Sequence, residues 1–199
     1  MIPVEELAAV TLGYLAGSIP FAFLVARRHG VDLRRSGSGN VGATNVLRTS
    51  GVSLAVTAMV LDAVKGAVAV LIAQRLTDGP ATPVAAGLAA IIGHIYPVWL
   101  QFRGGTGVAT AAGVFGVLTP LALAAAAGVF VLAVVVTRFI SVGSVAGALT
   151  LATVAVVDYP PPTAVVAGAI VAALAIVHRH RGNLARLVAG TERRLGQRI

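Results

Sequence analysis

Long apolar segments, separated by short polar ones, run through almost the whole chain. A transmembrane helix needs about 20 apolar residues, because the hydrocarbon core of a bilayer is about 30 Å thick. With this criterion, the pattern predicts membrane helices at residues 4–26, 52–74, 83–100, 108–118, 120–137, 141–157 and 163–177. The chain is therefore predicted to be an all-α integral membrane protein with about seven transmembrane helices.

Residues 108–118 are too short to span alone, so they form either a short span or the first half of one bent segment with 120–137. The positive-inside rule favours separate spans. With seven spans and the N-terminus outside, Arg75 lies outside and thirteen arginines lie inside: Arg27, Arg28, Arg34, Arg35, Arg48, Arg103, Arg138, Arg179, Arg181, Arg186, Arg193, Arg194 and Arg198. A single span over 108–137 would move the later arginines to the opposite side. The pattern thus predicts an outer N-terminus and a cytoplasmic C-terminus.

Composition agrees with a single polytopic membrane domain over residues 1–199. The 199 residues are 57% hydrophobic and 11% charged, with a mean hydropathy of +0.92. A net charge of +8 would suggest nucleic-acid binding in a soluble protein, but here it is better explained by membrane orientation. The chain has no cysteine, which excludes disulfides, thiolate metal sites and cysteine nucleophiles. The first charges, Glu5 and Glu6, are acidic and no basic region precedes the apolar run, which is atypical of a cleavable signal peptide.

The segment RRSGSGNVGATNVLR, residues 34–48, is the first cluster of polar residues between the predicted spans. Its glycines, Gly37 and Gly39 among them, allow backbone N–H groups to approach an anion. Ser38, Thr44 and Asn45 add side-chain donors, and Arg48 adds a positive charge. The cluster is a candidate phosphate-binding loop.

A second such cluster, QFRGGTG at residues 101–107, precedes the predicted helix 108–118. Arg103, Gly104 and Gly105 stand before a helix N-terminus, which itself favours anions. Two such loops on the predicted inner face suggest a substrate with more than one phosphate, or two phosphorylated substrates. The alternative is that both are tight turns whose arginines only orient the protein. Neither loop has the Gly-Lys-Ser/Thr ending of a P-loop, which argues against nucleotide hydrolysis.

Charged and imidazole side chains inside or near the spans are further candidates. Asp62 and Lys65 are i,i+3 neighbours within a span, and form either a substrate-facing pair or a structural one. His94 is either a general base or a helix-packing residue. Ser144, near the start of a span, has capping as its simpler role. His180 has no dense set of carboxylates around it in the sequence, so no metal site is predicted.

Five strings occur in the order seen in one family: GSIPFAFL, SGSGNVGATNVLR, LDAVKG, GHIYPVWLQFRGGTGVAT and NLARLVAGTE. On these strings the chain resembles the bacterial acyl-phosphate:glycerol-3-phosphate acyltransferases of the PlsY type. The resemblance implies a seven-helix enzyme of the bacterial plasma membrane with a cytoplasmic active site and no cofactor. It implies transfer of a fatty acyl group from acyl phosphate to glycerol 3-phosphate, which yields lysophosphatidic acid and phosphate.

The resemblance also assigns roles to residues, in two groups. The candidate catalytic residues are Ser38, Arg48, His94, Ser144 and Asn183. The candidate substrate-binding residues are Gly37, Gly39, Asn40, Thr44, Asn45, Lys65, Arg103, Gly104, Gly105, Thr106 and His180. On this resemblance, a phosphate oxygen of the substrate is expected to accept the hydroxyl proton, with His94 as the side-chain alternative.

Two positions depart from the family pattern. The usual KGGKG is Arg103-Gly-Gly-Thr106-Gly here, so the second positive charge is lost. Gly182 replaces the acidic residue that commonly precedes the asparagine. These departures leave a diverged paralogue, without catalysis or with another substrate, as the alternative. A transporter of a phosphorylated metabolite is a second alternative, although the two halves show no matching broken helices.

Overall fold

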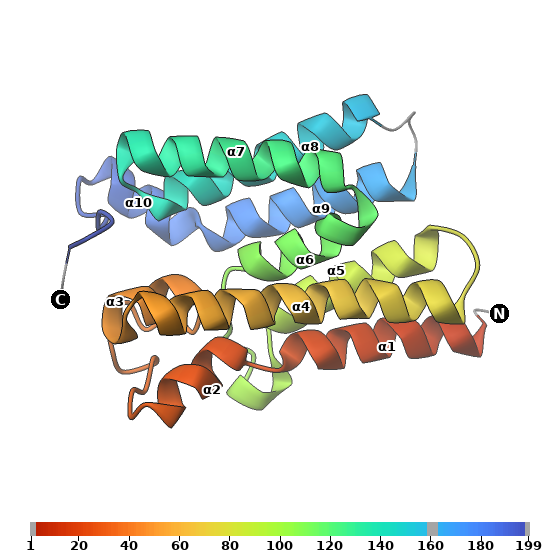
Figure 1. The fold of residues 1–199 in the computed structure, drawn as a ribbon, viewed down its shortest axis with the longest axis horizontal. Coiled ribbons are helices and arrows are strands. Elements are labelled where there is room, and N and C mark those ends of the chain that lie inside the picture. Colours follow the sequence, from red (N-terminus) through yellow and green to blue (C-terminus); the bar gives the residue numbers. More distant parts are fainter. Residues whose placement is uncertain (1–2, 159–162, 198–199) are drawn as a thin grey trace. The chain divides into compact units, whose positions relative to one another are not determined.

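A computed structural model of the chain describes residues 3–158 and 163–197, and every regular element in these two ranges is a helix (Figure 1). The predicted break at residues 158–162 lies almost entirely outside them. In chain order the helices are α1 (Val4–Ser18), α2 (Phe21–Arg28), α3 (Ala43–Ser50), α4 (Val52–Leu76), α5 (Ala81–Ile95), the 3-10 helix η1 (Val98–Leu100), α6 (Val108–Leu118), α7 (Pro120–Thr137), α8 (Ile140–Asp158), α9 (Ala164–Arg179) and α10 (Arg181–Val188).

The long apolar helices coincide with the predicted spans. Within the described residues, five segments are long and apolar enough to cross a membrane: Val4–Arg28, Val52–Leu76, Ala81–Leu100, Pro120–Thr137 and Ile140–Val157. The pair α9 and α10, bent by 51°, would be a sixth span. Helix α6 is separated from α7 at Thr119, and at 11 residues it is shorter than a full span. Its role as the seventh span stays a prediction.

The Cα positions group into two compact units. The N-terminal unit contains the described residues up to Val117, and the C-terminal unit contains Leu118–Gln197. Each unit is described below by itself.

Close contacts through glycine hold the N-terminal unit together. A β-carbon on Gly17 of α1 would collide with the backbone of Ala90 in α5, and one on Gly113 of α6 would collide with the backbone of Ala63 in α4. Small residues at such crossings let apolar helices approach closely, which is how helices associate in lipid. The glycine and alanine content of the spans therefore specifies packing as well as hydropathy.

Two short helices were not anticipated by the hydropathy pattern. The predicted span 4–26 is interrupted at Pro20, which lacks the N–H that a continuous helix would use, and α2 begins after it. Residues 43–50, expected as loop, form α3, which ends before Gly51 at a φ of 90°. Helix α2 precedes the 34–48 segment and α3 contains its last six residues, so both shape the first polar loop.

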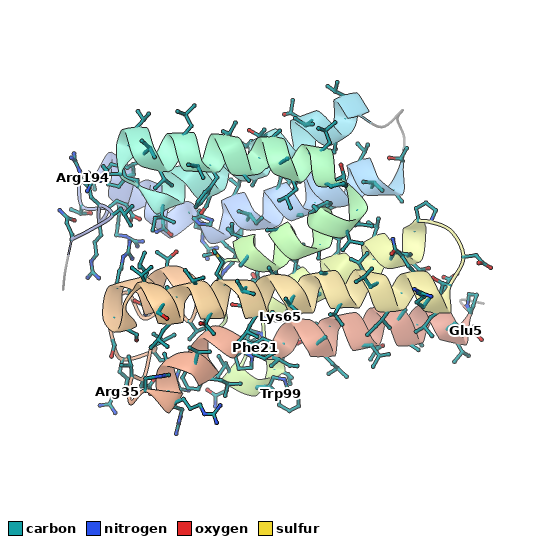
Figure 2. The ribbon with its side chains drawn as sticks, in the orientation of Figure 1. Glu5, Phe21, Arg35, Lys65, Trp99 and Arg194 are labelled. Atoms are coloured by element: carbon teal, nitrogen blue, oxygen red, sulfur yellow. The ribbon has the colours of Figure 1, made fainter. Side chains whose placement is uncertain are left out.

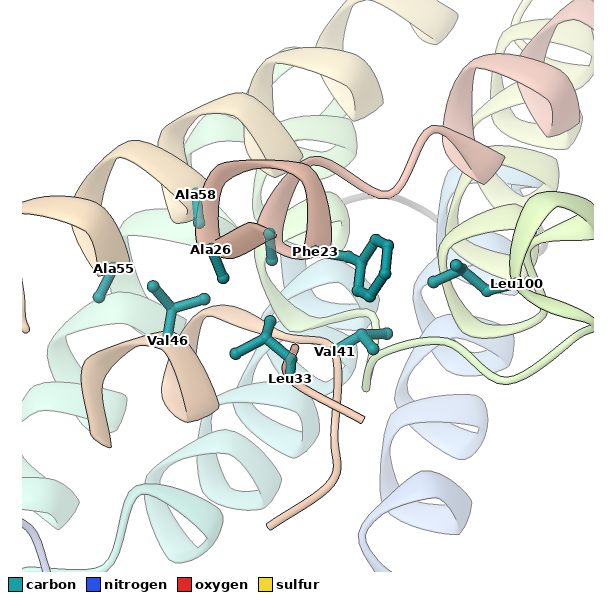
Figure 3. Packing of buried hydrophobic residues seen from close by; sticks show 9 residues of the cluster. Phe23, Ala26, Leu33, Val41, Val46, Ala55, Ala58 and Leu100 are labelled. Carbon is teal, nitrogen blue, oxygen red and sulfur yellow. The ribbon is translucent and has the colours of Figure 1, made fainter. Parts of the chain in front are cut away.

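A small apolar cluster anchors this loop to its surroundings (Figure 3). Leu33 and Val46 are fully buried and belong to one cluster with residues of α2 and α4, including Ala58. Val41, in the middle of the loop, and Leu100, at the end of η1, belong to the same cluster. The core thus joins the first polar loop to the segment that leads into the second one.

In the C-terminal unit, α8 packs against α7 and α9. A β-carbon on Gly143 would lie 2.8 Å from the backbone oxygen of Phe130, so α7 and α8 also cross closely. The chain after α10 returns to the α7–α8 turn, where the N–H of Leu195 donates to the carbonyl oxygen of Arg138 at 2.6 Å. This contact ties the C-terminal segment to the start of α8.

Candidate active site

Asn45 organises the first polar loop from inside. It is 1% exposed, and its Nδ2 lies 3.1, 3.0 and 2.8 Å from the carbonyl oxygens of Leu33, Ser36 and Asn40. Its Oδ1 accepts the N–H of Ser38 at 2.9 Å. All of its polar atoms are therefore engaged with the loop backbone. Asn45, predicted as a phosphate contact, supports the loop in this structure.

The glycines of the loop serve the same arrangement. Gly37 and Gly39 have φ values of 65° and 74°, the left-handed region that glycine adopts at little cost. A β-carbon on Gly37 would also collide with Oδ1 of Asn45. Asn40 contributes a local bond, with its Oδ1 accepting the N–H of Gly42 at 2.9 Å.

This folding leaves other predicted groups at the loop surface. Ser38 is exposed, while Thr44 lies in the first turn of α3 and Arg48 in its last turn, both half-buried. The first N–H groups of a helix have no partner within the helix and favour an anion. Ser38, Thr44 and the α3 N-terminus are thus the groups of this loop that could donate to a phosphate, and Arg48 could supply a positive charge.

The second loop is bonded to the end of α5. The N–H of Gly105 donates to the carbonyl oxygen of His94 at 3.1 Å, and the N–H of Gly104 donates to that of Ile95 at 3.0 Å. These two N–H groups, predicted to face a phosphate, instead hold the loop in place. Arg103, exposed, and Thr106, half-buried, stand on either side of the two buried glycines.

Backbone strain marks the start of this loop. Gln101 and Phe102 have φ values of 52° and 61°, which non-glycine residues rarely adopt. Left-handed backbone costs roughly 1–2 kcal/mol per residue, and such strain persists only where the surroundings enforce it. The N–H of Phe102 donates to Pro97 O at 2.9 Å and that of Arg103 to Leu100 O at 3.1 Å. The chain then enters α6, whose N-terminal N–H groups could bind an anion.

The two loops approach each other within the N-terminal unit. Val41 of the first loop and Gly105 of the second line one small cavity, together with Ser18, Asp62, Lys65 and His94. Val41 also shares the apolar cluster of Figure 3 with Leu100. The predicted convergence of residues 34–48 and 101–107 is therefore present in this unit.

Asp62, Lys65 and His94 meet beside this cavity. Lys65 Nζ lies 2.7 Å from Oδ1 of Asp62, and His94 Nδ1 lies 3.5 Å from the same oxygen. All three side chains are less than a tenth exposed. The sequence pattern recognised the Asp62–Lys65 pair but not the third member, which comes from another helix.

In the C-terminal unit, Glu192 accepts hydrogen bonds from the predicted site residue Asn183 and from two other residues. Its Oε1 accepts Asn183 Nδ2 at 2.8 Å and Ser141 Oγ at 3.1 Å, and its Oε2 accepts Arg186 Nε at 2.8 Å. Burial favours the neutral acid, but these donors outweigh it and hold the pKa of Glu192 below its ordinary value. Glu192 was not among the predicted site residues. The sequence signals for it were its place at the end of the family string NLARLVAGTE and its being the single acidic residue in a basic tail.

Ser144 and His180 lie in the same unit, both about 5% exposed. Ser144 Oγ donates to the carbonyl oxygen of Ile140 at 3.0 Å within α8. His180 Nδ1 lies 2.8 Å from Ile176 O, and because a carbonyl only accepts, this contact places the proton on Nδ1. In neutral His180 the other ring nitrogen is then an acceptor.

The family profile described as Glycerol-3-phosphate acyltransferase matches residues 7–190 of this chain. The chain is 50% identical over 190 residues to the glycerol-3-phosphate acyltransferase of Myxococcus xanthus. The aligned region covers 94% of this chain and 98% of that protein. The chain belongs to the glycerol-3-phosphate acyltransferase family. It is also 43% identical over 191 residues to the member from Geobacter sulfurreducens, covering 96% of this chain and 97% of that one.

Solved structures of the family agree. The crystal structure of PlsY, an integral membrane glycerol 3-phosphate acyltransferase, in its glycerol 3-phosphate form has a TM-score of 0.91 to this chain at 38% identity, covering 96% of both chains. The lysophosphatidic acid form has a TM-score of 0.89, covering 96% of this chain and 95% of the other. The predicted all-α membrane fold and the predicted family are thus confirmed, and the chain is an integral membrane protein.

Proposed function

We propose that this protein transfers a fatty acyl group from acyl phosphate to glycerol 3-phosphate, producing lysophosphatidic acid and inorganic phosphate. The observation that carries the proposal is the family match over nearly the whole chain. It is supported by the similarity to two PlsY crystal structures, one the glycerol 3-phosphate form and the other the lysophosphatidic acid form. This reaction is the first acylation in phospholipid synthesis. It needs one lipid substrate and one small water-soluble substrate, both carrying phosphate.

The reaction does not require the protein to form a covalent intermediate. Acyl phosphate is a mixed anhydride with a good leaving group, so the primary hydroxyl of glycerol 3-phosphate attacks the carbonyl carbon directly. The new carbon–oxygen ester bond forms, the bond between the carbonyl carbon and the phosphate oxygen breaks, and the hydroxyl proton leaves on the released phosphate. The tasks left to the protein are positioning the substrates and neutralising their negative charge.

The polar groups left at the surface of the two loops suit these tasks. Ser38 and the N-terminus of α3 are donors for one phosphate group, with Arg48 as the cation of the first loop. Arg103, Thr106 and the N-terminus of α6 are the corresponding groups of the second loop. Ser144, His180 and Asn183 remain proposed pocket residues of the C-terminal unit.

Orientation in the membrane follows from the same proposal, because acyl transfer to a cytosolic substrate needs the polar loops on the cytoplasmic side. We expect the N-terminus outside and the C-terminal tail inside. The chain has no native cysteine, so Arg35→Cys and Arg194→Cys give single-thiol variants. Both thiols should react with a membrane-impermeant reagent from the cytoplasmic side only. Labelling of the two positions from opposite sides would refute the common inner face.

The decisive experiment is enzymatic. Purified protein in detergent is given palmitoyl phosphate and glycerol 3-phosphate without added divalent metal, and phosphate and lysophosphatidic acid are measured. We expect both products in equal amounts. Arg48→Ala should raise the KM for glycerol 3-phosphate or abolish turnover, whereas Arg75→Ala, at the far end of α4, is the matched control with wild-type kinetics.

A diverged paralogue that only binds lipid phosphate is the rival, and the observation that favours it is Thr106 in place of the usual lysine. No product above a protein-free control, combined with tight binding of lysophosphatidic acid, would establish that rival. A transporter of a phosphorylated metabolite would instead move labelled glycerol 3-phosphate into sealed vesicles without forming product.

A further inference from the structure

The cluster of Asp62, Lys65 and His94 is almost closed to solvent, with side-chain exposures of 2%, 3% and 8%. Charged groups inside a membrane span are costly unless they are paired and hydrogen-bonded. Asp62 supplies the pairing, because its Oδ1 lies 2.7 Å from the Lys65 ammonium and 3.5 Å from the His94 imidazole, but this buried oxygen has no hydrogen bond of good geometry among the described residues.

Lys65 is occupied by the protein itself. Besides Asp62, its Nζ donates to the carbonyl oxygen of Ile19 at 2.8 Å and lies 5.9 Å from the centre of the Phe21 ring; Figure 2 labels Lys65 and Phe21. Ile19 and Phe21 flank the break between α1 and α2. Lys65 therefore ties α4 to this break, and its three N–H groups have protein partners in reach.

The neighbouring cavity is too small for a substrate. The volume within which the centre of a water molecule can move is about 10 Å³. The lining includes Ser18, whose buried hydroxyl has no hydrogen-bond partner among the described residues. A space of roughly 10–15 Å³ on this measure holds a single water molecule. A phosphate group is larger than one water molecule, so this structure does not support direct phosphate binding beside Lys65.

His94 connects the cluster to the second loop. Its Nδ1 faces Asp62, while a β-carbon on Gly105 would collide with its Nε2, so the imidazole is packed directly against the loop backbone. The backbone carbonyls of His94 and Ile95 also accept the N–H groups of Gly105 and Gly104. Because Nε2 is packed against Gly105, a substrate hydroxyl has little room to approach this side of the ring.

We propose that Asp62, Lys65 and His94 are positioning residues: the ion pair on α4 orients the His94 imidazole, which supports the RGGTG loop in the conformation that binds substrate phosphate. The proposal rests on the acyltransferase function given above for this loop. It replaces the alternative in which His94 is a general base and Lys65 a phosphate ligand. A displaced loop lowers the affinity for phosphate and leaves the mechanism of proton transfer unchanged.

The test compares two His94 variants. His94→Asn keeps a side-chain donor on the Nδ1 side, near Asp62, whereas His94→Ala keeps none. We expect His94→Ala to raise the KM for glycerol 3-phosphate or acyl phosphate by at least about tenfold, since a misplacement of about 1 Å costs up to about 100-fold. His94→Asn should recover much of this loss, and the pH–rate profile of both variants should keep its shape. Equal loss in the two variants, or loss of one limb of the profile, would identify a general base and overturn the proposal.

A second variant removes the ion pair. Asp62→Asn combined with Lys65→Met deletes both charges together, because deleting one would leave the other unpaired in the membrane. Asp78→Asn is the control, an identical carboxylate-to-amide change at an exposed position. The double variant should raise the same KM, and Asp78→Asn should leave it at the wild-type value. Wild-type KM in a folded double variant would refute the role of the pair.

Hydrogen exchange separates this proposal from the assigned reaction. In His94→Ala and in the double variant, amides of residues 103–107 should exchange faster than in wild type, while those of residues 34–42 should not change. This holds even if the wild-type protein makes no lysophosphatidic acid, in which case the proposed function fails and the positioning role is still tested. Unchanged exchange at residues 103–107, or faster exchange throughout the N-terminal unit, would contradict a specific loop support.

Discussion

Replacing Asn45 by alanine should open the first polar loop without unfolding the helices around it. The amide of Asn45 has two N–H bonds and one carbonyl oxygen, so its four contacts at 2.8–3.1 Å amount to three full hydrogen bonds. A net value of about 1 kcal/mol for each gives about 3 kcal/mol for the loop. Of the stranded partners, the carbonyl of fully buried Leu33 has the least access to water.

The assay is hydrogen exchange of residues 34–42, because a local opening equilibrium sets the exchange rate of such a loop. A loss of about 3 kcal/mol predicts exchange about 100-fold faster, at about 1.4 kcal/mol for each factor of ten. Asn40→Ala, which loses one hydrogen bond in this segment, should give about a fivefold effect from about 1 kcal/mol. Asn45→Asp should be worse than alanine, because a carboxylate would face carbonyl oxygens. Exchange in Asn45→Ala no faster than in Asn40→Ala would refute the assignment of Asn45 as the organiser.

Two further predictions concern charge. Thr106→Lys restores the family's second cation beside Arg103. It should lower the KM for the phosphate substrates by about tenfold or more, because a hydrogen bond to a charged group contributes about 1.5–3 kcal/mol and about 1.4 kcal/mol is a factor of ten. An unchanged or higher KM would show that Thr106 lies away from the phosphate. The depressed pKa of Glu192 means that its contacts stabilise the fold above its ordinary pKa of 4.5 and are lost as the pH falls through its lower folded value. The melting temperature of the wild type should therefore be steady above pH 5 and fall below about pH 4. Glu192→Gln should be less stable at pH 7 and should lack this contribution to acid sensitivity. Equal stability of the two proteins at pH 7 would contradict the role of the carboxylate.

The positions of the long helices could be read from the sequence. Helix α4 was predicted as residues 52–74 and observed as Val52–Leu76, and α7 was predicted with both of its observed ends. Hydropathy suffices here because a membrane helix satisfies its own backbone and must only be apolar for about 20 residues. Family membership was also visible, because the polar strings between spans are distinctive in order and content.

The roles of the polar residues were decided by tertiary contacts. From sequence, Asn45 and Arg48 are alike as donors beside a glycine-rich turn, but burial commits Asn45 to three backbone carbonyls. Likewise, Asp62 and Lys65 are recognisable from the sequence as charged residues within a span. His94, 29 residues after Lys65, lies beside them only because α5 packs against α4. Helix periodicity carries no information about which residue of another helix lies opposite.

Hydropathy and local motifs depend on neighbours in the chain, so the sequence by itself determined the spans, the all-α membrane class and the polar loops. A hydrogen-bonding side chain has no such local constraint, since it takes whichever partner the packed helices bring within 3 Å or so. Glu192 shows the difference most directly: one carboxylate holds groups from α8 and α10 through three hydrogen bonds. Only the fold determines such partners, because they are separated in sequence and brought together by close packing of small apolar residues.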